Sequence, residues 1–462
     1  MRRSVIAAIS TPPGKGGVAV IRTSGDGALD IAESVFRTKS KKSIKDYPPR
    51  TQIYGYVCRG DEIIDDGLIT YFPKSSSYTG EETVELSVHG GVLVTRTVLE
   101  VLFERGAAPA EPGEFTRLAF LNGRLTLTEV EGIGDLLEAK SEEQMRLGSA
   151  SARDRLKGKI REVRAALTEL LSSIYARIDY PEEDLGELSD SDCEKRLSII
   201  RKELSTLIDT YRTGRAIREG IPAVLCGKPN VGKSTLYNLL LGEDAAIVTD
   251  TPGTTRDVLE REIPLGRVLL RLTDTAGVRV SGVSDEIEKI GISRTKARIA
   301  DAELIFALFD LSRPIDGEDT ALLTELRAVR APKIAVFTKC DATPVADTSV
   351  LLDKFDATVT VSAQDNPEET VSSLSAIVEG LFTDEKISPS SDAIVSSARQ
   401  HAALTAALGY IDTALDAYRL GIPADAASSD VELALGAIGE VDGLSVRDEV
   451  VSDIFSRFCV GK

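Results

Sequence analysis

Hydrophobic residues recur every three or four positions in two widely separated parts of the chain. The first run lies between residues 156 and 211, and the second begins after residue 400. This spacing is typical of helices that bury one face, so both runs predict helices of a single helical domain. The expected core positions are Leu156, Ile160, Val163, Leu167, Leu170, Ile174, Ile178, Leu204, Leu207 and Tyr211 in the first run, and Leu404, Leu408, Ile411, Leu415, Val446, Val450, Ile454 and Phe458 in the second.

The segments outside these helical runs have other patterns. Residues 218–384 alternate short apolar strands with helical stretches, which is typical of a doubly wound α/β domain. Residues 1–120 contain alternating stretches such as GVAVIRTSG, TQIYGYV and ETVELSVHGG, with one amphipathic helix near Leu93 to Arg105. They predict a compact α+β domain. The helical domain then comprises residues 121–217 and 385–462, and the α/β domain is inserted into it.

Composition narrows the class of protein. With 73 acidic and 55 basic residues the net charge is −18, which argues against a protein that coats itself with nucleic acid but leaves room for a local basic patch. Five scattered cysteines without CxxC pairs indicate neither a disulfide framework nor a zinc site. No apolar run reaches the roughly 18–20 residues of a membrane span, and the apolar run at the start is too short for a secretory signal. We therefore expect a cytoplasmic protein.

The strongest chemical signal is GKPNVGKS, residues 227–234, which lies between an apolar run and a predicted helix. It is a G-x-x-x-x-G-K-S loop in the strand–loop–helix setting that this phosphate-binding motif requires. Its glycines let backbone N–H groups surround phosphates, and the N-terminus of the helix favours their negative charge. Lys233 is expected to reach the outer phosphates of a nucleotide, and the hydroxyl of Ser234 to ligate Mg²⁺.

Two further segments predict the rest of a magnesium–triphosphate site. TDTPGTTRD offers hydroxyl groups in a loop, and Thr255 is the candidate to ligate Mg²⁺ when a triphosphate is bound. In TDTAG, the carboxylate of Asp274 follows a buried strand and can hold Mg²⁺ through water, while the amide of Gly277 can meet the γ-phosphate. Together with the phosphate-binding loop, these segments are typical of a GTPase domain.

The base is read by two more segments. TKCD follows an apolar strand, and the carboxylate of Asp341 can accept the two N–H donors of guanine, a pair that adenine lacks. VSAQ fits the loop that closes over the base. The first position of TKCD is usually asparagine; here Thr338 can brace the phosphate-binding loop through its hydroxyl, with somewhat weaker nucleotide affinity as the expected effect. The predicted GTP contacts are Asn230, Val231, Gly232, Lys233, Ser234, Thr235, Thr249, Asp250, Thr251, Pro252, Gly253, Thr254, Thr255, Asp274, Thr275, Ala276, Gly277, Thr338, Lys339, Asp341, Ser362 and Ala363.

Longer segments add a resemblance to a known family. The chain resembles the MnmE (TrmE) family of tRNA modification GTPases over essentially its whole length. The segments that carry the resemblance are TPPGKGGVAVIR, SYTGEETVELSVHGG, AEPGEFTRLAFLNGRLTLTEVEGIGDLLEAKSEEQ, the series from GKPNVGKS to TKCD, and CVGK at residues 459–462. Several of them are long and peculiar to this family.

The resemblance implies an architecture and an activity. It implies an α+β N-terminal domain that forms a homodimer and binds a tetrahydrofolate derivative, a helical domain, and an inserted Ras-like GTPase domain that pairs with its copy when GTP is bound. It also implies an FAD-dependent, MnmG-like partner, with FAD on the partner only. The two proteins together add an aminomethyl-type (carboxymethylaminomethyl) group to carbon 5 of the wobble uridine of certain tRNAs, using a 5-formyl or methylene folate as the one-carbon donor.

The resemblance also assigns roles to single residues. It places Arg22, Glu85, Arg124 and Lys462 around the folate, and it would explain FCVGK as a segment that lines the folate pocket. Cationic side chains suit a folate's glutamate carboxylate, and Glu85 suits the N–H groups of the pterin. The family has been suspected of using a thiol at the position of Cys459. Glu288 matches the family's water-positioning glutamate, and the K⁺ ligands that the resemblance implies are Asn230, Thr249, Thr251 and Thr254.

Three alternatives remain open at this point. A regulatory GTPase that binds RNA or a ribosome assembly intermediate, without modification chemistry, would share every nucleotide motif. Asn230 could simply stabilise a turn, and a glutamate in an exposed acidic run such as that of Glu288 is often only a solvated charge. His89, before two glycines, is expected to be structural rather than catalytic.

Overall fold

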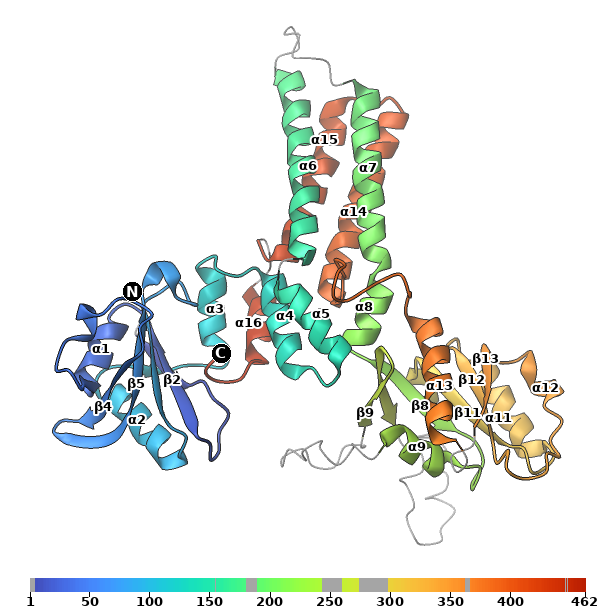
Figure 1. Ribbon diagram of the computed structural model, residues 1–462. Coiled ribbons are helices and arrows are strands. Elements are labelled where there is room, and N and C mark those ends of the chain that lie inside the picture. Colours follow the sequence, from blue (N-terminus) through green and yellow to red (C-terminus); the bar gives the residue numbers. More distant parts are fainter. Residues whose placement is uncertain are drawn as a thin grey trace. The chain divides into compact units, whose positions relative to one another are not determined.

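The computed structural model divides into two compact units, which are described separately (Figure 1). Unit 1 comprises Met1–Leu137, Ser151–Asp190 and Gly409–Lys462, and unit 2 comprises Glu138–Ala150 and Ser191–Leu408. In the described part of the chain, no helix is long and apolar enough to cross a membrane. The described residues are 5–153, 155–179, 189–242, 260–273, 298–361, 366–444, 446 and 448–462.

The N-terminal part of unit 1 is built on a seven-stranded sheet with the strand order β3-β4-β5-β6-β2-β1-β7. Its neighbouring strands are antiparallel, apart from the parallel pair of β1 and β7. The strands are β1 (Ile6–Ile9), β2 (Val18–Ser24), β3 (Phe36–Thr38), β4 (Ile53–Arg59), β5 (Glu62–Phe72), β6 (Thr83–His89) and β7 (Ala108–Pro109); the helices are α1 (Ala28–Val35), α2 (Val92–Glu104) and α3 (Glu114–Leu121), with short 3₁₀ turns η1 (Ile44–Asp46) and η2 (Lys74–Ser76).

The two faces of this sheet have different partners. Alternating residues of the central strands, including Ile21, Ile69 and Leu86, form one core with α1 and α2. A smaller cluster on the other side joins β1 to α3 through the fully buried ring of Phe115. Because strand residues alternate between faces, Arg22 of β2 and Glu85 of β6 point away from the α1–α2 core, and the other β6 side chains on that face, those of Thr83, Ser87 and His89, are polar as well. This face of the sheet carries part of the candidate site.

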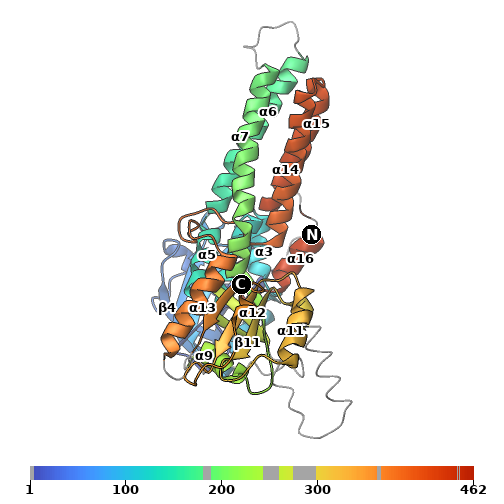
Figure 2. The same cartoon turned by 90° about the vertical axis from the view of Figure 1, so that its right-hand side faces the viewer.

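The helical part of unit 1 combines helices that precede the nucleotide domain in the sequence with helices that follow it. Helices α6 and α15 lie side by side along their lengths (Figures 1 and 2). A second cluster joins α4 to α16 through Val130, Val451, Phe455 and Phe458. The helices are α4 (Leu127–Glu138), α6 (Arg155–Asp179), α15 (Ala424–Asp442) and α16 (Asp448–Ser456), together with the second half of α14 (Ala398–Arg419).

Most positions of the predicted stripes are buried, but two are exposed, and four more are half-buried, namely Tyr211, Leu408, Val446 and Ile454. The stripe of α6 is buried from Leu156 to Ile174, but Ile178 is 39% exposed because it lies next to the end of the helix. In the last stripe, Val450 is 38% exposed, and the neighbouring Val451 is buried instead. The prediction was wrong there because burial in α16 follows the packing of Val451 and Phe455 against α4 rather than the helical spacing alone.

Unit 2 contains a six-stranded sheet with the order β13-β12-β11-β8-β10-β9, parallel except for the pair of β9 and β10. Helices α9 and α13 share one core with the sheet, and α11 packs on its other face. The sheet elements are β8 (Ile221–Cys226), α9 (Lys233–Leu241), β9 (Glu260–Leu265), β10 (Val268–Thr273), β11 (Leu304–Asp310), α11 (Gly317–Arg327), β12 (Lys333–Thr338), α12 (Ser349–Leu352), β13 (Ala357–Thr360) and α13 (Pro367–Phe382); unit 2 also holds α5 (Glu142–Ala152), α7 (Asp190–Asp209), α8 (Tyr211–Arg218) and the first half of α14.

The predicted fold class is confirmed. A mixed α+β sheet domain, long amphipathic helices from two parts of the sequence, and a doubly wound sheet between those parts are all present. The doubly wound sheet has the expected consequence for a site: the loops after its parallel strands meet at one edge, where ligands bind in such folds. The domain boundaries at residues 120, 217 and 384 stay a prediction.

Candidate functional site

The phosphate-binding loop joins β8 to α9 in unit 2. Because β8 ends at Cys226 and α9 begins at Lys233, the loop lies at the positive end of a helix. Gly227 has φ +146°, and a Cβ there would lie 2.7 Å from the backbone oxygen of Leu308, so a side chain cannot be accommodated. Lys233 donates from Nζ to the backbone oxygens of Gly227 at 2.7 Å and of Lys228 at 2.6 Å. The side chain of Lys233, which would bind phosphate, thus lies across the phosphate-binding loop itself.

The guanine-reading segment contacts this loop directly. Thr338, the last residue of β12, donates from Oγ1 to the backbone oxygen of Val231 at 2.7 Å, and it lies 3.2 Å from that of Phe309. This is the brace that the sequence suggests for a threonine in place of the usual asparagine. Lys339 follows with φ +56°, and Asp341 is exposed beyond it. The hydroxyl group of Thr338 therefore links the segment predicted to read the base to the loop predicted to bind the phosphates.

Many predicted GTP contacts lie outside the described residues. Of the predicted K⁺ ligands only Asn230 is described; it is exposed in the phosphate-binding loop with φ +60°. Ser234 and Thr235 are exposed in the first turn of α9, where a hydroxyl group can reach a metal ion beside a bound phosphate. The residues outside the described part are Thr249, Asp250, Thr251, Pro252, Gly253, Thr254, Thr255, Asp274, Thr275, Ala276, Gly277, Glu288, Ser362 and Ala363.

In unit 1, two of the four predicted folate residues pair with each other. Arg22 and Glu85 are opposite one another on β2 and β6, and the guanidinium Nε donates to the carboxylate at 2.9 Å. The guanidinium carbon also lies 5.7 Å from the ring centre of Tyr78 and 5.6 Å from that of Phe115. Both polar groups are thus held in fixed positions on the face of the sheet that α1 and α2 do not cover.

The segment Cys459–Lys462 is hydrogen-bonded to the same region. The backbone N–H of Phe115 donates to the backbone oxygen of Lys462 at 3.1 Å, and the hydroxyl of Ser10 donates to that of Gly461 at 3.0 Å. Phe115 therefore connects the segment to Arg22, because its ring lies against the guanidinium and its amide holds Lys462. The thiol of Cys459 is exposed. Three of the four predicted folate residues thus come together around one phenylalanine.

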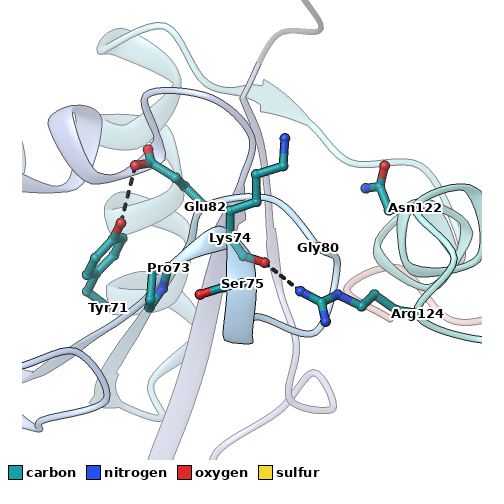
Figure 3. A pocket seen from close by; sticks show the side chains of 8 residues that line it. All are labelled: Tyr71, Pro73, Lys74, Ser75, Gly80, Glu82, Asn122 and Arg124. Atoms are coloured by element: carbon teal, nitrogen blue, oxygen red, sulfur yellow. Dashed lines mark hydrogen bonds between the residues drawn. The ribbon is translucent and has the colours of Figure 1, made fainter.

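The fourth, Arg124, lines an open pocket of about 620 Å³ beside this cluster (Figure 3). Its Nη2 donates to the backbone oxygen of Lys74 at 2.7 Å, while the hydroxyl of Tyr71 donates to Glu82 at 3.2 Å. A Cβ on Gly80 would lie 2.9 Å from the Cβ of Asn122, so a larger residue at position 80 would clash with the pocket residue Asn122. Arg22, Glu85 and Lys462 do not line the pocket. Its lining residues are Tyr71, Pro73, Lys74, Ser75, Gly80, Glu82, Asn122 and Arg124.

Sequence reasoning missed most of this pocket. Gly80 and Glu82 belong to YTGEE, a loop-like segment whose second glutamate, Glu82, could have marked the site. Lys74 and Asn122 carry no sequence signal, since lysine and asparagine are common in loops. Their position depends on how β5 and α3 end, which the local pattern does not determine.

His89 is held by a carboxylate at the end of β6. Its ring Nδ1 lies 2.8 Å from Asp65 Oδ1, and its backbone N–H donates to Oδ2 at 2.8 Å. The hydroxyl of Tyr54 donates to Asp66 at 3.0 Å. Ligand atoms of Asp65, Asp66 and His89 lie within 4.8 Å of one another, but these hydrogen bonds already use them. The geometry favours a structural His89.

We expect His89 to titrate above pH 6.5, the ordinary value of histidine. The hydrogen bond to Asp65 and the charge of Asp65 raise the pKa of His89. A raised pKa means that the contact stabilises the fold fully below about pH 6.5 and that this stabilisation is lost as the pH rises through the higher folded value. NMR of ¹³C-histidine-labelled protein measures it directly, since the chain has 2 histidines and a His401→Gln variant assigns the signal. Asp65→Asn should lower the midpoint; an unchanged midpoint would contradict the assignment.

The chain matches two family models and many curated proteins. The models are the GTP-binding protein TrmE N-terminus, over residues 5–124, and the MnmE helical domain, over residues 127–459. The chain is 35% identical over 457 residues to the tRNA modification GTPase MnmE of Clostridioides difficile (strain 630), with 99% of each chain covered. It is 38% identical over 462 residues to that of Thermotoga sp. (strain RQ2), with 99% of each covered, and 36% identical over 463 residues to that of Acetivibrio thermocellus, with 100% of each covered.

Proposed function

The chain belongs to the MnmE family of tRNA modification GTPases, and on this premise we propose that it couples GTP hydrolysis to modification of the tRNA wobble uridine. An FAD-bearing, MnmG-like partner and a tetrahydrofolate one-carbon donor complete the reaction, which adds a carboxymethylaminomethyl-type group at carbon 5. The protein acts in the cytoplasm as a homodimer through its N-terminal domain, with GTP-dependent pairing of the GTPase domains.

The observation that supports this proposal most directly is the position of the CVGK segment. Its backbone is hydrogen-bonded beside the Arg22–Glu85 pair, in a unit that holds no nucleotide motif. A regulatory GTPase without modification chemistry would not need such an arrangement. In the proposed folate complex, Arg22 and Lys462 bind carboxylate groups and Glu85 accepts hydrogen bonds from the pterin. Arg124 binds from the neighbouring pocket.

The nucleotide site supplies the hydrolysis. The backbone N–H groups of the loop and the N-terminus of α9 bind the phosphates, and Lys233 exchanges the carbonyl oxygens of Gly227 and Lys228 for phosphate oxygens. Ser234 and Thr255 hold Mg²⁺, which neutralises the charge that develops on the phosphates. The carboxylate of Asp341 selects guanine, and Glu288 positions the attacking water.

We expect GTP turnover to be about tenfold or more faster in KCl than in NaCl at equal ionic strength. Asn230 supplies an exposed amide oxygen, and Thr249, Thr251 and Thr254 complete an oxygen site that suits K⁺ and would replace a catalytic arginine. Phosphate release measured in the two salts, with nucleotide affinity as the control, tests this. Equal turnover would remove K⁺ from the proposal.

The modification itself is tested by nucleoside mass spectrometry of bulk tRNA. A strain deleted for the gene should lack aminomethyl-type wobble uridines, and the same strain complemented with the gene should regain them. An unchanged uridine profile would leave the GTPase chemistry in place and favour the regulatory GTPase. Co-purification of a flavoprotein and folate binding by the isolated protein would distinguish the tRNA modification function from the regulatory GTPase without a deletion strain.

A further inference from the structure

Lys228, the second residue of the phosphate-binding loop, forms ion pairs with the N-terminus of α11. This helix packs on the opposite face of the sheet from α9. Lys228 Nζ lies 2.5 Å from Asp316 Oδ1 and 2.6 Å from Asp319 Oδ2. These two aspartates form the capping box of α11, in which the carboxylate of Asp316 accepts from the backbone N–H of Asp319 and the carboxylate of Asp319 accepts from that of Asp316. The side chains of Lys228 and Asp319 are 11% and 8% exposed, so this ion pair is largely removed from solvent. The phosphate-binding loop is thus anchored to the start of α11.

A second buried carboxylate anchors the guanine-reading segment. Asp310, the last residue of β11, accepts from Lys339 Nζ at 2.6 Å and from Arg313 Nε at 2.8 Å. Its other oxygen accepts from the hydroxyl of Ser312 at 2.6 Å and from the backbone N–H of the same residue at 2.9 Å. Burial raises the pKa of Asp310, but the hydrogen bonds from Lys339, Ser312 and Arg313 outweigh it and hold the pKa well below its usual value.

The two anchors belong to one short segment. Asp310 ends β11, Asp316 caps α11, and β11 is the strand between β8 and β12, which carry the two nucleotide loops. We propose that the segment from Asp310 to Asp319 is a positioning element that fixes the phosphate-binding loop and the guanine-reading segment relative to each other. It touches the site through Lys228 and Lys339 rather than through nucleotide contacts of its own.

Each anchor acts on a group that matters for binding. The backbone oxygen of Lys228 accepts a hydrogen bond from Lys233 Nζ, so a displaced Lys228 displaces the phosphate-binding ammonium as well. Lys339 is separated by one residue from Asp341, so Asp310 sets the position of the carboxylate that reads guanine. Charge-assisted hydrogen bonds with several donors per carboxylate favour one geometry, whereas apolar contacts would tolerate small shifts.

The test uses the affinities of the full-length protein for GDP and inosine diphosphate, which lacks the 2-amino group of guanine. Lys228→Met should weaken the affinities for GDP and inosine diphosphate about tenfold each and leave the ratio of the two affinities unchanged, because both nucleotides carry the same phosphates. Asp310→Asn should weaken GDP more than inosine diphosphate, so that the preference for GDP falls about tenfold. Lys228→Arg keeps a charged donor for the carboxylates of Asp316 and Asp319, so its affinities should stay within about twofold of those of the wild type.

Two exposed residues of the same unit serve as matched controls: Lys354→Met and Asp353→Asn make the same changes of charge away from both anchors. Wild-type affinity of Lys228→Met, or an unchanged base preference of Asp310→Asn, would overturn the proposal. If Asp310→Asn does not fold, Ser312→Ala, which removes one donor to Asp310 at a half-buried position, is measured in its place against the same criterion. For Asp310→Asn, a loss of stability leaves the ratio of the two affinities unchanged, whereas a loss of positioning changes it. For Lys228→Met, a thermal melt like that of the wild type shows that the weaker affinities do not come from a loss of stability.

Discussion

An Asp341→Asn protein is expected to lose about a hundredfold or more in GTP affinity and to bind xanthosine triphosphate instead. The carboxylate accepts two N–H donors from guanine, and each such charge-assisted hydrogen bond contributes about 1.5–3 kcal/mol. An asparagine still accepts from N1–H, but its amide N–H₂ then opposes the 2-amino group of guanine. Xanthine has a carbonyl oxygen at that position, which the amide can donate to, so the preferred base changes with the residue.

Competition titrations with GTP and xanthosine triphosphate measure this preference. Asp353→Asn, the same change at an exposed position of the same unit, is the control and should leave both affinities unchanged. Retained GTP affinity in Asp341→Asn would mean that TKCD does not read the base.

Removal of residues 459–462 is expected to abolish tRNA modification and to weaken folate binding about tenfold or more. The deletion removes Lys462 as a carboxylate partner and leaves the amides of Phe115 and Gly113 without their acceptors, Lys462 and Cys459. GTP hydrolysis should stay within about twofold of the intact protein, because the nucleotide motifs lie in the other unit. Folate binding by calorimetry and phosphate release on the same preparations test both statements.

Single substitutions separate the parts of this effect. Lys462→Ala keeps the backbone oxygen that Phe115 binds, so it should weaken folate binding without moving the segment. Cys459→Ser should abolish modification only if the thiol takes part in the chemistry. Val460→Ala, at a side chain that is 53% exposed, is the matched control. Full modification by the shortened protein would refute a role for the segment.

The local pattern of the sequence predicted the elements of the nucleotide site well. A strand, a glycine-rich loop and a helix follow from GKPNVGKS, and the brace from Thr338 to the phosphate-binding loop follows from its place at the start of TKCD. Both depend on motifs whose residues act on neighbours in a fixed topology. The ion pairs of Lys228 could not be predicted, because it occupies a motif position without a preferred residue and its partners come from a distant helix.

Tertiary contacts account for the other differences. Arg22 and Glu85 were predicted as separate folate contacts, but they also pair with each other, because the register of β2 and β6 places them opposite one another. In α16 the predicted face was displaced by one residue, because burial follows the packing of Val451 and Phe455 against α4 rather than the spacing alone. Register and helix ends depend on distant segments, which a local pattern does not contain.

The contact between Ser10 and Gly461 also sets an order for folding during synthesis. These residues are 451 positions apart, and at roughly 5–20 residues per second the second is made roughly 20–90 s after the first. The N-terminal sheet can therefore form on the ribosome while the backbone amide of Phe115 still lacks its acceptor. The candidate folate site is completed only after the nucleotide domain has been made, so shorter nascent chains would carry a formed sheet but an unfinished site.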